Sequence, residues 1–293
     1  MIWAEAARKI SHTLRDEYPP EQSLFAAWRI LSDVSGEPLN TILPWKSHAE
    51  VPEPHARTLD NILSRMRAQE PIEYILGKSS FYSLDITVSK SVLIPRPETE
   101  ILVESVIGWH TRHDRIPRMV LDLGTGSGCI ALALAHAFPD VHVTMVDRSP
   151  DALRTAKENI SEYRLFQRVS CVASDWWNGL TSGKSWDVVV SNPPYIRRAD
   201  LMSLPLSVRE FEPVFSLDGG EDGFDGFRAI ISGSIHGLSP NGLLALECGW
   251  DQADNIVAMI NKTDAFSSCW VEKDLSGVPR IILALRKENT HAA

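Results

Sequence analysis

The chain has 293 residues, of which 44% are hydrophobic and 23% charged, and its net charge is −9 at pH 7. This length and composition predict a globular protein with one large domain and one small one. Neither half is basic, since residues 1–78 carry nine basic and eleven acidic side chains and residues 79–293 carry 20 and 27. The charge therefore argues against a protein that holds nucleic acid mainly through its phosphates.

Membrane, export and metal-binding signals are also missing from the sequence. No apolar run reaches the eighteen or so residues of a membrane span, and Glu5, Arg8 and Lys9 stand where a signal peptide would be apolar. We therefore expect a cytoplasmic protein without a membrane partner. The cysteines form no CxxC pair and the histidines no HExxH motif, so we expect free thiols and no metal site.

The first part of the chain is predicted to be helical. Leu59, Ile62, Leu63 and Met66 recur at helical spacing. We expect a small helical domain over residues 1–78. The segment SFYSLDITVS then alternates and is rich in aromatic and β-branched residues, which predicts a β-hairpin linker over residues 79–92.

From Arg118 onward, short apolar runs alternate with helical segments, which predicts a parallel, doubly wound α/β sheet in a domain over residues 93–293. Apolar runs without polar alternation suit strands that helices cover on both faces. The predicted strands are MVLDLG, VHVTMVD, VSCVASD, WDVVVSN, LLALECG and RIILALR.

The first of these strands runs into a glycine-rich turn that leads to a helix beginning near Cys129. The turn consists of Gly124, Thr125, Gly126, Ser127 and Gly128. Nineteen residues further on, Asp147 ends the second strand, where a carboxylate can accept hydrogen bonds from both hydroxyls of an adenosine ribose. Each part alone has a structural explanation, a βα turn and a helix cap; their order favours a site for an adenosine-containing ligand.

The spacing of the glycines distinguishes between such ligands. It is GxGxG, whereas dinucleotide folds use GxGxxG with a pyrophosphate at the helix N-terminus. This disfavours NAD and favours S-adenosylmethionine, which has no phosphate. At the end of the third strand, Asp175 offers an acceptor for the adenine amino group and Trp176 a ring to pack on adenine, although a tryptophan here suits a core position equally well.

The fourth strand ends at Asn192, which Pro193, Pro194 and Tyr195 follow. Two prolines remove two backbone donors and stiffen the turn, so the amide oxygen of Asn192 and the carbonyl of Pro193 remain as acceptors. Two acceptors can hold the two hydrogens of a planar, amide-like NH₂ group and direct its lone pair at a methyl donor, with Tyr195 packed on the planar group. The structural alternative is a proline turn that merely ends a strand.

Taken together, these segments resemble the release factor glutamine methyltransferase family, the PrmC or HemK type. The resemblance runs from about Pro71 to Arg286 and is carried by PIEYILG, LIPRPETE, LDLGTGSGCIALALA, SDWW, SNPPYI and REFEP. It implies a Rossmann-like class I methyltransferase sheet, preceded by a helical domain that helps to dock the substrate.

The resemblance also implies an activity. The family methylates the side-chain amide nitrogen (N5) of the glutamine in the GGQ motif of class-1 peptide chain release factors, with S-adenosylmethionine as the cofactor, and so supports translation termination. Residues 124–128, Asp147, Trp176 and Asn192 match its cofactor positions, and Asn192 to Tyr195 match its substrate-holding segment. We expect direct transfer to the amide nitrogen, without a covalent intermediate, a metal or a strong general base.

Four charged residues in the matching motifs receive no definite role from the sequence: Arg96, Glu98, Arg209 and Glu212. Arg96 and Glu98 could form a charged pair that opens a helix. The segment EPVFSL, residues 212–217, departs from the family, which more often has smaller residues before its leucine.

Three other functions remain open. The acceptor array would also suit an adenine amino group of DNA or RNA, but the acidic charge and the lack of a basic domain argue against that substrate. A noncatalytic adenosine-ligand sensor would not need the Asn-Pro-Pro-Tyr segment, and a nicotinamide-dependent oxidoreductase does not fit the glycine spacing. We expect a monomer that does not bind nucleic acid directly.

Overall fold

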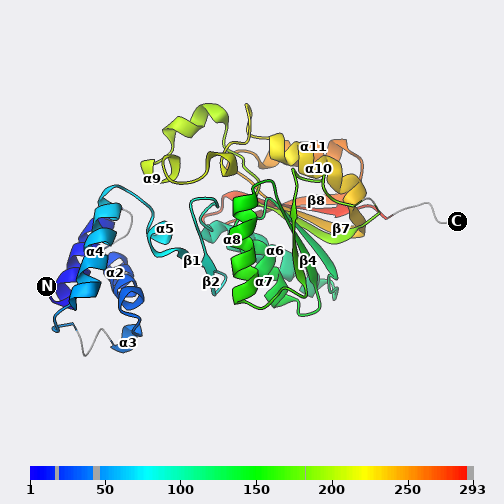
Figure 1. Cartoon of the computed structure of the whole chain (residues 1–293). Coiled ribbons are helices and arrows are strands. Elements are labelled where there is room, and N and C mark those ends of the chain that lie inside the picture. The colour runs from blue at the N-terminus through cyan, green and yellow to red at the C-terminus, as the bar shows by residue number, and fades with distance from the viewer. Residues whose placement is uncertain (17–19, 42–46, 182, 289–293) are drawn as a thin grey trace. The chain divides into compact units, whose positions relative to one another are not determined.

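The computed structural model describes residues 1–16, 20–41, 47–181 and 183–288. It divides into two compact units, one of Met1–Gly77 with Leu206–Phe211 and one of Lys78–Pro205 with Glu212–Ala293 (Figure 1). The first division lies one residue before the boundary that the sequence predicts. The return segment Leu206–Phe211 groups with the helical unit, although its sequence lies within the expected methyltransferase domain.

The first unit is helical. Its elements are α1 (Trp3–Thr13), the 3₁₀ helix η1 (Leu14–Asp16), α2 (Pro20–Ser35), α3 (Leu39–Thr41), α4 (Glu53–Arg67), α5 (Ile72–Leu76) and α9 (Leu206–Arg209). α4 buries Leu59, Ile62, Leu63 and Met66, the four apolar positions that recur in the sequence, against a core that includes Trp3 of α1. One apolar stripe per helix thus forms the core of this unit.

The second unit begins with a two-stranded antiparallel hairpin, β1 (Lys78–Phe81) and β2 (Leu84–Thr87). Its two turn residues, Tyr82 and Ser83, have φ values of +49° and +63°. Positive φ at both central residues is the geometry of the type I′ turn, whose twist matches that of the two strands.

A seven-stranded sheet forms the centre of this unit. The strands are β3 (Met119–Leu123), β4 (His142–Asp147), β5 (Val169–Ala173), β6 (Trp186–Ser191), β7 (Leu238–Glu247), β8 (Phe266–Lys273) and β9 (Pro279–Arg286). Their spatial order is β5-β4-β3-β6-β7-β9-β8. The order reverses at β3, which pairs in parallel with β4 on one side and β6 on the other. Such a reversal is where ligands bind in open α/β sheets.

The sheet differs from the sequence prediction at one edge. Strand β9 runs antiparallel to both β7 and β8, so the sheet is mostly but not wholly parallel. Strand β8 was not predicted from the sequence. In this edge strand Ser267 and Ser268 are exposed, and most of the other residues are half-buried. The strand therefore lacks the continuous apolar run that is typical of the inner strands.

Helices cover both faces of the sheet. α6 (Pro97–Arg112), α7 (Cys129–Ala137) and α8 (Pro150–Glu162) lie on one face, and α10 (Asp225–Gly237) and α11 (Ala253–Lys262) lie on the other (Figure 1). Two short 3₁₀ helices, η3 (Arg198–Ser203) and η4 (Val214–Ser216), lie in the connection between β6 and α10. No helix in the described part of the chain is long and apolar enough to cross a membrane.

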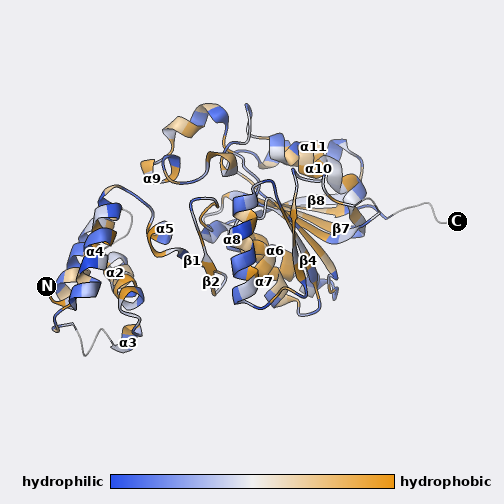
Figure 2. Ribbon diagram, viewed as in Figure 1, coloured by the Kyte–Doolittle hydropathy of each residue, from blue (hydrophilic) through white to orange (hydrophobic). Residues whose placement is uncertain are grey.

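The hydropathy colouring follows this layering, with apolar strands between helices whose outer faces are polar (Figure 2). Leu121 and Leu123 of β3 and Leu244 of β7 share one core cluster with Phe227 of α10 and Ile256 of α11. The burial of this apolar surface stabilises the sheet.

Two glycines of α10, Gly233 and Gly237, make room for the indole of Trp177, which a Cβ at either position would overlap. We expect Gly233→Ala to reduce the free energy of unfolding by about 1–3 kcal/mol, because the indole is packed too closely to move aside.

Gly108→Ala in α6 is the matched control, since its Cβ would lie 3.7 Å from the nearest atom, in the flexible Arg112 side chain. It should be neutral or stabilise by up to about 1 kcal/mol. Urea unfolding measures both; equal effects would contradict the packing argument.

Candidate functional site

A cavity of about 240 Å³ lies where β3, β4, β5 and β6 end. Its walls come from the loops after these four strands, from residues 91–99 and from the loop before α10. Parallel strands end at one edge of their sheet, so residues that are distant in sequence meet there.

The glycine-rich turn forms one wall. Gly124, Thr125, Gly126 and Ser127 line the cavity, and a Cβ at Gly126 would meet no atom within 4 Å. The turn is held by the carbonyl of Val146, which accepts hydrogen bonds from the amides of Gly124 (2.8 Å) and Thr125 (2.9 Å). The missing side chains leave the backbone open to a ligand.

Gly128 serves a different purpose and does not line the cavity. Its φ is +83°, it precedes α7, and a Cβ there would lie 2.8 Å from the Cε of Met145 in β4. It is therefore a packing glycine that lets the helix approach the strand. The sequence motif alone does not separate this position from the cavity-lining ones.

Asp147 ends β4 and faces the cavity, with only 8% of its surface exposed. Oδ2 accepts a hydrogen bond from the amide of Gly126 (2.9 Å) and Oδ1 from the amide of Ser149 (2.8 Å). Burial raises the pKa of this carboxyl, and the backbone donors act in the opposite direction. The carboxylate thus joins the glycine-rich turn to the start of α8.

The two tryptophans after β5 have separate positions. Asp175, which is exposed, and Trp176, which is half-buried, both line the cavity. Trp177 instead packs edge-on against Trp186, with ring centroids 5.9 Å apart, and against the glycines of α10. The structure thus places Asp175 and Trp176 on the cavity wall and Trp177 in the core.

The Asn-Pro-Pro-Tyr segment follows β6 directly. Asn192 and Pro194 line the cavity, whereas Pro193 is buried against Gly226, where a Cβ would lie 2.9 Å from the Pro193 Cβ. Tyr195 is half-buried, packs on the core cluster of β7 and α10, and does not line the cavity. Burial raises the pKa of its phenol to about 12.

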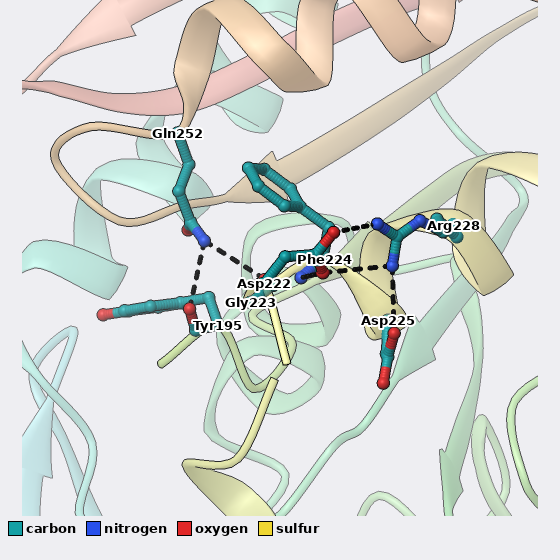
Figure 3. A network of polar contacts seen from close by, with 7 residues as sticks. All are labelled: Tyr195, Asp222, Gly223, Phe224, Asp225, Arg228 and Gln252. Carbon is teal, nitrogen blue, oxygen red and sulfur yellow. Dashed lines mark hydrogen bonds and ion pairs between the residues drawn. The ribbon is translucent and has the colours of Figure 1, made fainter. Parts of the chain in front are cut away.

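The side chain of Gln252, which is 2% exposed, forms hydrogen bonds with the Asn-Pro-Pro-Tyr segment and with the loop before α10 (Figure 3). Its Nε2 donates to the carbonyls of Tyr195 (3.0 Å) and Gly223 (3.1 Å), and its Oε1 accepts from the amide of Gly249 (2.9 Å). One buried amide side chain therefore joins the end of β6, the end of β7 and the loop before α10. Beside it, Arg228 forms ion pairs with Asp222 and Asp225.

The segment before α10, together with the first residue of that helix, forms a wall that was not predicted from the sequence. Phe215, Ser216, Asp218, Gly220 and Asp225 line the cavity. In the sequence this loop is marked by the glycine-rich run DGGEDG, residues 218–223. Glycine is needed at positions 219 and 223 because a Cβ at either would lie within 3 Å of the backbone of the Asn-Pro-Pro-Tyr segment. Glycines at such spacing mark a close backbone approach.

The charged residues left open by the sequence also receive positions. Arg96 lines the cavity and pairs with the buried Glu212, not with Glu98. The other oxygen of Glu212 accepts from the amide of Ile94 (3.4 Å). Arg209 lies beside Glu210, with Nε and Oε1 3.0 Å apart. Arg96 and Glu212 thus join two cavity walls that are 116 residues apart in the sequence.

The sequence of this chain is similar to those of known methyltransferases. A family model described as "Methyltransferase small domain" matches residues 99–204. The chain is 40% identical over 238 residues to a release factor glutamine methyltransferase of Clostridium acetobutylicum, covering 81% of this chain and 82% of that protein. It is 35% identical over 258 residues to one of Caulobacter vibrioides, covering 88% of each. The chain belongs to the release factor glutamine methyltransferase family.

The solved structures support the fold of this release factor glutamine methyltransferase family member. A T. thermophilus 16S rRNA methyltransferase, solved with AdoMet and guanosine, is 17% identical and superimposes with a TM-score of 0.52, covering 72% of this chain and 50% of that one. The predicted family and the class I methyltransferase fold class are thus both confirmed.

A buried carboxylate, Asp122 of β3, lies directly behind the glycine-rich turn. It is fully buried; Oδ2 accepts from the hydroxyl of Thr125 (2.5 Å), and Oδ1 has no hydrogen-bond partner among the described residues. Burial raises the pKa of this carboxyl to about 7. An acid whose pKa is higher in the folded state than in the unfolded chain stabilises the fold less as pH rises between the two values.

We therefore expect Asp122→Asn to gain stability relative to the wild type as pH rises from about 5 to about 8. The reason is that the wild type loses a proton from a buried group while the amide does not titrate. Urea unfolding of both proteins at each pH gives the difference. A difference that does not change with pH would show that Asp122 is already ionised at the lower value.

Proposed function

We propose that this enzyme transfers a methyl group from S-adenosylmethionine to the side-chain amide nitrogen (N5) of the GGQ glutamine in class-1 peptide chain release factors. The observation that carries the proposal is the position of Asn192, at the end of β6 and on the wall of the same cavity as Asp147 and the glycine-rich turn. Family membership supports the same activity, since the relatives are named for release factor glutamine methylation.

The cavity residues fit S-adenosylmethionine. The turn of residues 124–127 would border the methionine part, because Gly126 has open space where a side chain would stand. Asp147 would accept hydrogen bonds from the ribose hydroxyls, Asp175 would accept one from the adenine amino group, and Trp176 would pack on the adenine ring. When bound, this cofactor supplies an electrophilic methyl group on a sulfonium centre.

The substrate-holding residues would be Asn192, Pro193, Pro194 and Tyr195. The amide oxygen of Asn192 and the carbonyl of Pro193 would each accept one hydrogen of the substrate NH₂ group. Tyr195, which does not line the cavity, would pack on the plane of this group from beside it. As the nitrogen attacks it gains positive charge, so both acceptors bind the transition state more tightly than the ground state. The acceptors also orient a weak nucleophile.

The helical unit is a docking module for the release factor in this proposal. A protein substrate needs a surface beyond the pocket that holds one glutamine, and none of the described residues of this unit lines the cavity. We propose a cytoplasmic monomer that does not bind nucleic acid directly, in accord with the net charge of −9.

The first prediction of the proposal concerns the cofactor. Asp147→Asn should weaken S-adenosylmethionine binding by about tenfold or more, because the charged acceptor for two hydroxyls is replaced by a neutral one. Asp151→Asn is the matched control, since Asp151 is an exposed acid in the first turn of α8, four residues away. Isothermal titration calorimetry measures both affinities. Equal affinities in the two variants would remove Asp147 from the binding site.

The second prediction concerns the transfer step. Asn192→Ala should lower kcat roughly 100-fold, because one acceptor for the developing charge is lost. Its Kd for S-adenosylmethionine should change far less. The exposed Asn255→Ala in α11 is the control. Single-turnover methyl transfer at saturating cofactor gives the rates, and a wild-type rate in Asn192→Ala would exclude the proposed role.

Mass spectrometry of a purified release factor tests the function as a whole. After incubation with the enzyme and S-adenosylmethionine, we expect one added methyl on the GGQ glutamine, and none on a factor in which this glutamine is alanine. An unmodified factor, together with methyl transfer to DNA or RNA in a parallel reaction, would overturn the proposal in favour of an adenine substrate.

A further inference from the structure

Side chains of α8 pair with the edge of β2 that lies opposite β1. Tyr163, the C-cap residue of α8, accepts a hydrogen bond from the amide of Asp85 (2.8 Å) and donates one to the carbonyl of the same residue (3.0 Å). Four positions earlier, Asn159 treats Thr87 in the same way: Oδ1 accepts from its amide (2.7 Å) and Nδ2 donates to its carbonyl (2.9 Å). A helix face therefore covers an edge that would otherwise need another strand.

The spacing of the helix matches that of the strand. Thr155 continues the series, because its hydroxyl lies 3.0 Å from that of Ser89, two residues beyond the end of β2. Positions four apart on a helix advance by about 6 Å, and positions two apart on a strand by about 6.6 Å. Every fourth residue of the helix thus meets every second residue of the strand. We call Thr155, Asn159 and Tyr163 the polar ladder.

Asn159 also reaches the glycine-rich turn. Its Nδ2 donates a second hydrogen bond, to the carbonyl of Ser127 (2.9 Å). The side chain is fully buried and does not line the cavity. Its orientation is fixed by Thr87, because a backbone amide must meet the oxygen of the side chain and a backbone carbonyl its nitrogen. One side chain thus joins the hairpin to the turn.

This contact fixes the peptide unit between Ser127 and Gly128. The carbonyl of the unit accepts from Asn159, and its amide, that of Gly128, donates to the carbonyl of Thr125 (2.8 Å). The start of the turn is held separately, by the carbonyl of Val146 in β4. A glycine-rich backbone has many accessible conformations, so a turn held at both ends loses less entropy when a ligand binds.

We propose that Asn159 is a positioning residue for the cofactor: it holds the end of the glycine-rich turn against the hairpin, so that the backbone bordering S-adenosylmethionine is in place before binding. The inference rests on the proposed cofactor site and not on the identity of the methyl acceptor. It gives the hairpin, which the sequence predicts only as a linker, a part in cofactor binding.

Two substitutions in the polar ladder separate the turn from the hairpin. Asn159→Ala leaves the carbonyls of Ser127 and Thr87 without their donor. Tyr163→Phe is the matched control, since it removes the contacts with Asp85 and leaves those of the turn in place. We expect Asn159→Ala to weaken S-adenosylmethionine binding about tenfold or more, and Tyr163→Phe to keep the Kd within about twofold of the wild type.

Isothermal titration calorimetry gives both affinities. Asn159→Asp is the second variant if alanine prevents folding, because it keeps the size of the side chain and the acceptor for Thr87 while removing the NH₂ donor. It should weaken binding in the same direction. A Kd within about twofold of the wild type in the Asn159 variant, or an equal loss in Tyr163→Phe, would overturn the proposal.

The kinetic constants distinguish cofactor positioning from stability. Asn159→Ala should raise the KM for S-adenosylmethionine while kcat at saturating cofactor stays within about threefold, because the side chain acts on the turn and not on the transferred methyl group. A lower melting temperature together with an unchanged KM would assign Asn159 to stability alone.

Hydrogen–deuterium exchange tests the contact without turnover or cofactor. The amides of residues 124–128 should exchange faster in Asn159→Ala and at the wild-type rate in Tyr163→Phe, whereas those of residues 84–88 should exchange faster in both. If the wild type does not bind S-adenosylmethionine, the proposed cofactor site fails, and exchange at the turn still shows whether Asn159 holds it. Unchanged exchange of residues 124–128 in Asn159→Ala would overturn the inference.

Discussion

Parallel strands end at the same edge of their sheet, and this constraint determines where the glycine-rich turn, Asp147 and Asn192 lie. β3, β4 and β6 are neighbours, so the glycine-rich turn, Asp147 and Asn192 meet although 45 residues separate the last two along the chain. The reversal of strand order at β3 leaves a crevice that helices do not cover. The cavity is thus a product of the topology, and the loop residues only give it its chemistry.

The features predictable from sequence are those with a local signal. Continuous apolar runs identified six of the seven strands, and the glycine-rich turn and the Asn-Pro-Pro-Tyr segment identified two walls of the cavity. The edge strand β8 was missed because its half-exposed residues form no such run. A local signal also does not reveal that Gly128 packs against Met145, because this neighbour comes from a strand that the motif does not contain.

Ion pairs and hydrogen bonds between residues that are distant along the chain could not be predicted from the sequence. From the sequence, Arg96 could form a charged pair with Glu98, two positions away. In the structure it forms an ion pair with Glu212. Gln252 lies 57 residues from the carbonyl it holds, and Thr99 lies 93 residues from Asn192. A single sequence does not indicate which distant group a side chain will contact, because the contact depends on how the sheet and its helices pack.

The Asn-Pro-Pro-Tyr segment is held from two sides. Gln252 donates a hydrogen bond to the carbonyl of Tyr195, and Thr99 accepts one from the side chain of Asn192, the first residue of the segment. Pro193 adds stiffness because its φ is restricted and it is buried against α10. A substrate amide would therefore meet acceptors that are already in place, which reduces the reorganisation needed during the reaction.

The buried carboxylates Asp122 and Glu247 have a consequence for protein engineering. Each occupies an inner strand of the sheet and has one oxygen without a partner among the described residues, so each makes the fold less stable than an apolar core would. Selection of variants for heat tolerance alone would tend to replace these acids. A stabilised scaffold obtained in that way would retain its architecture while losing the buried charges of its inner strands.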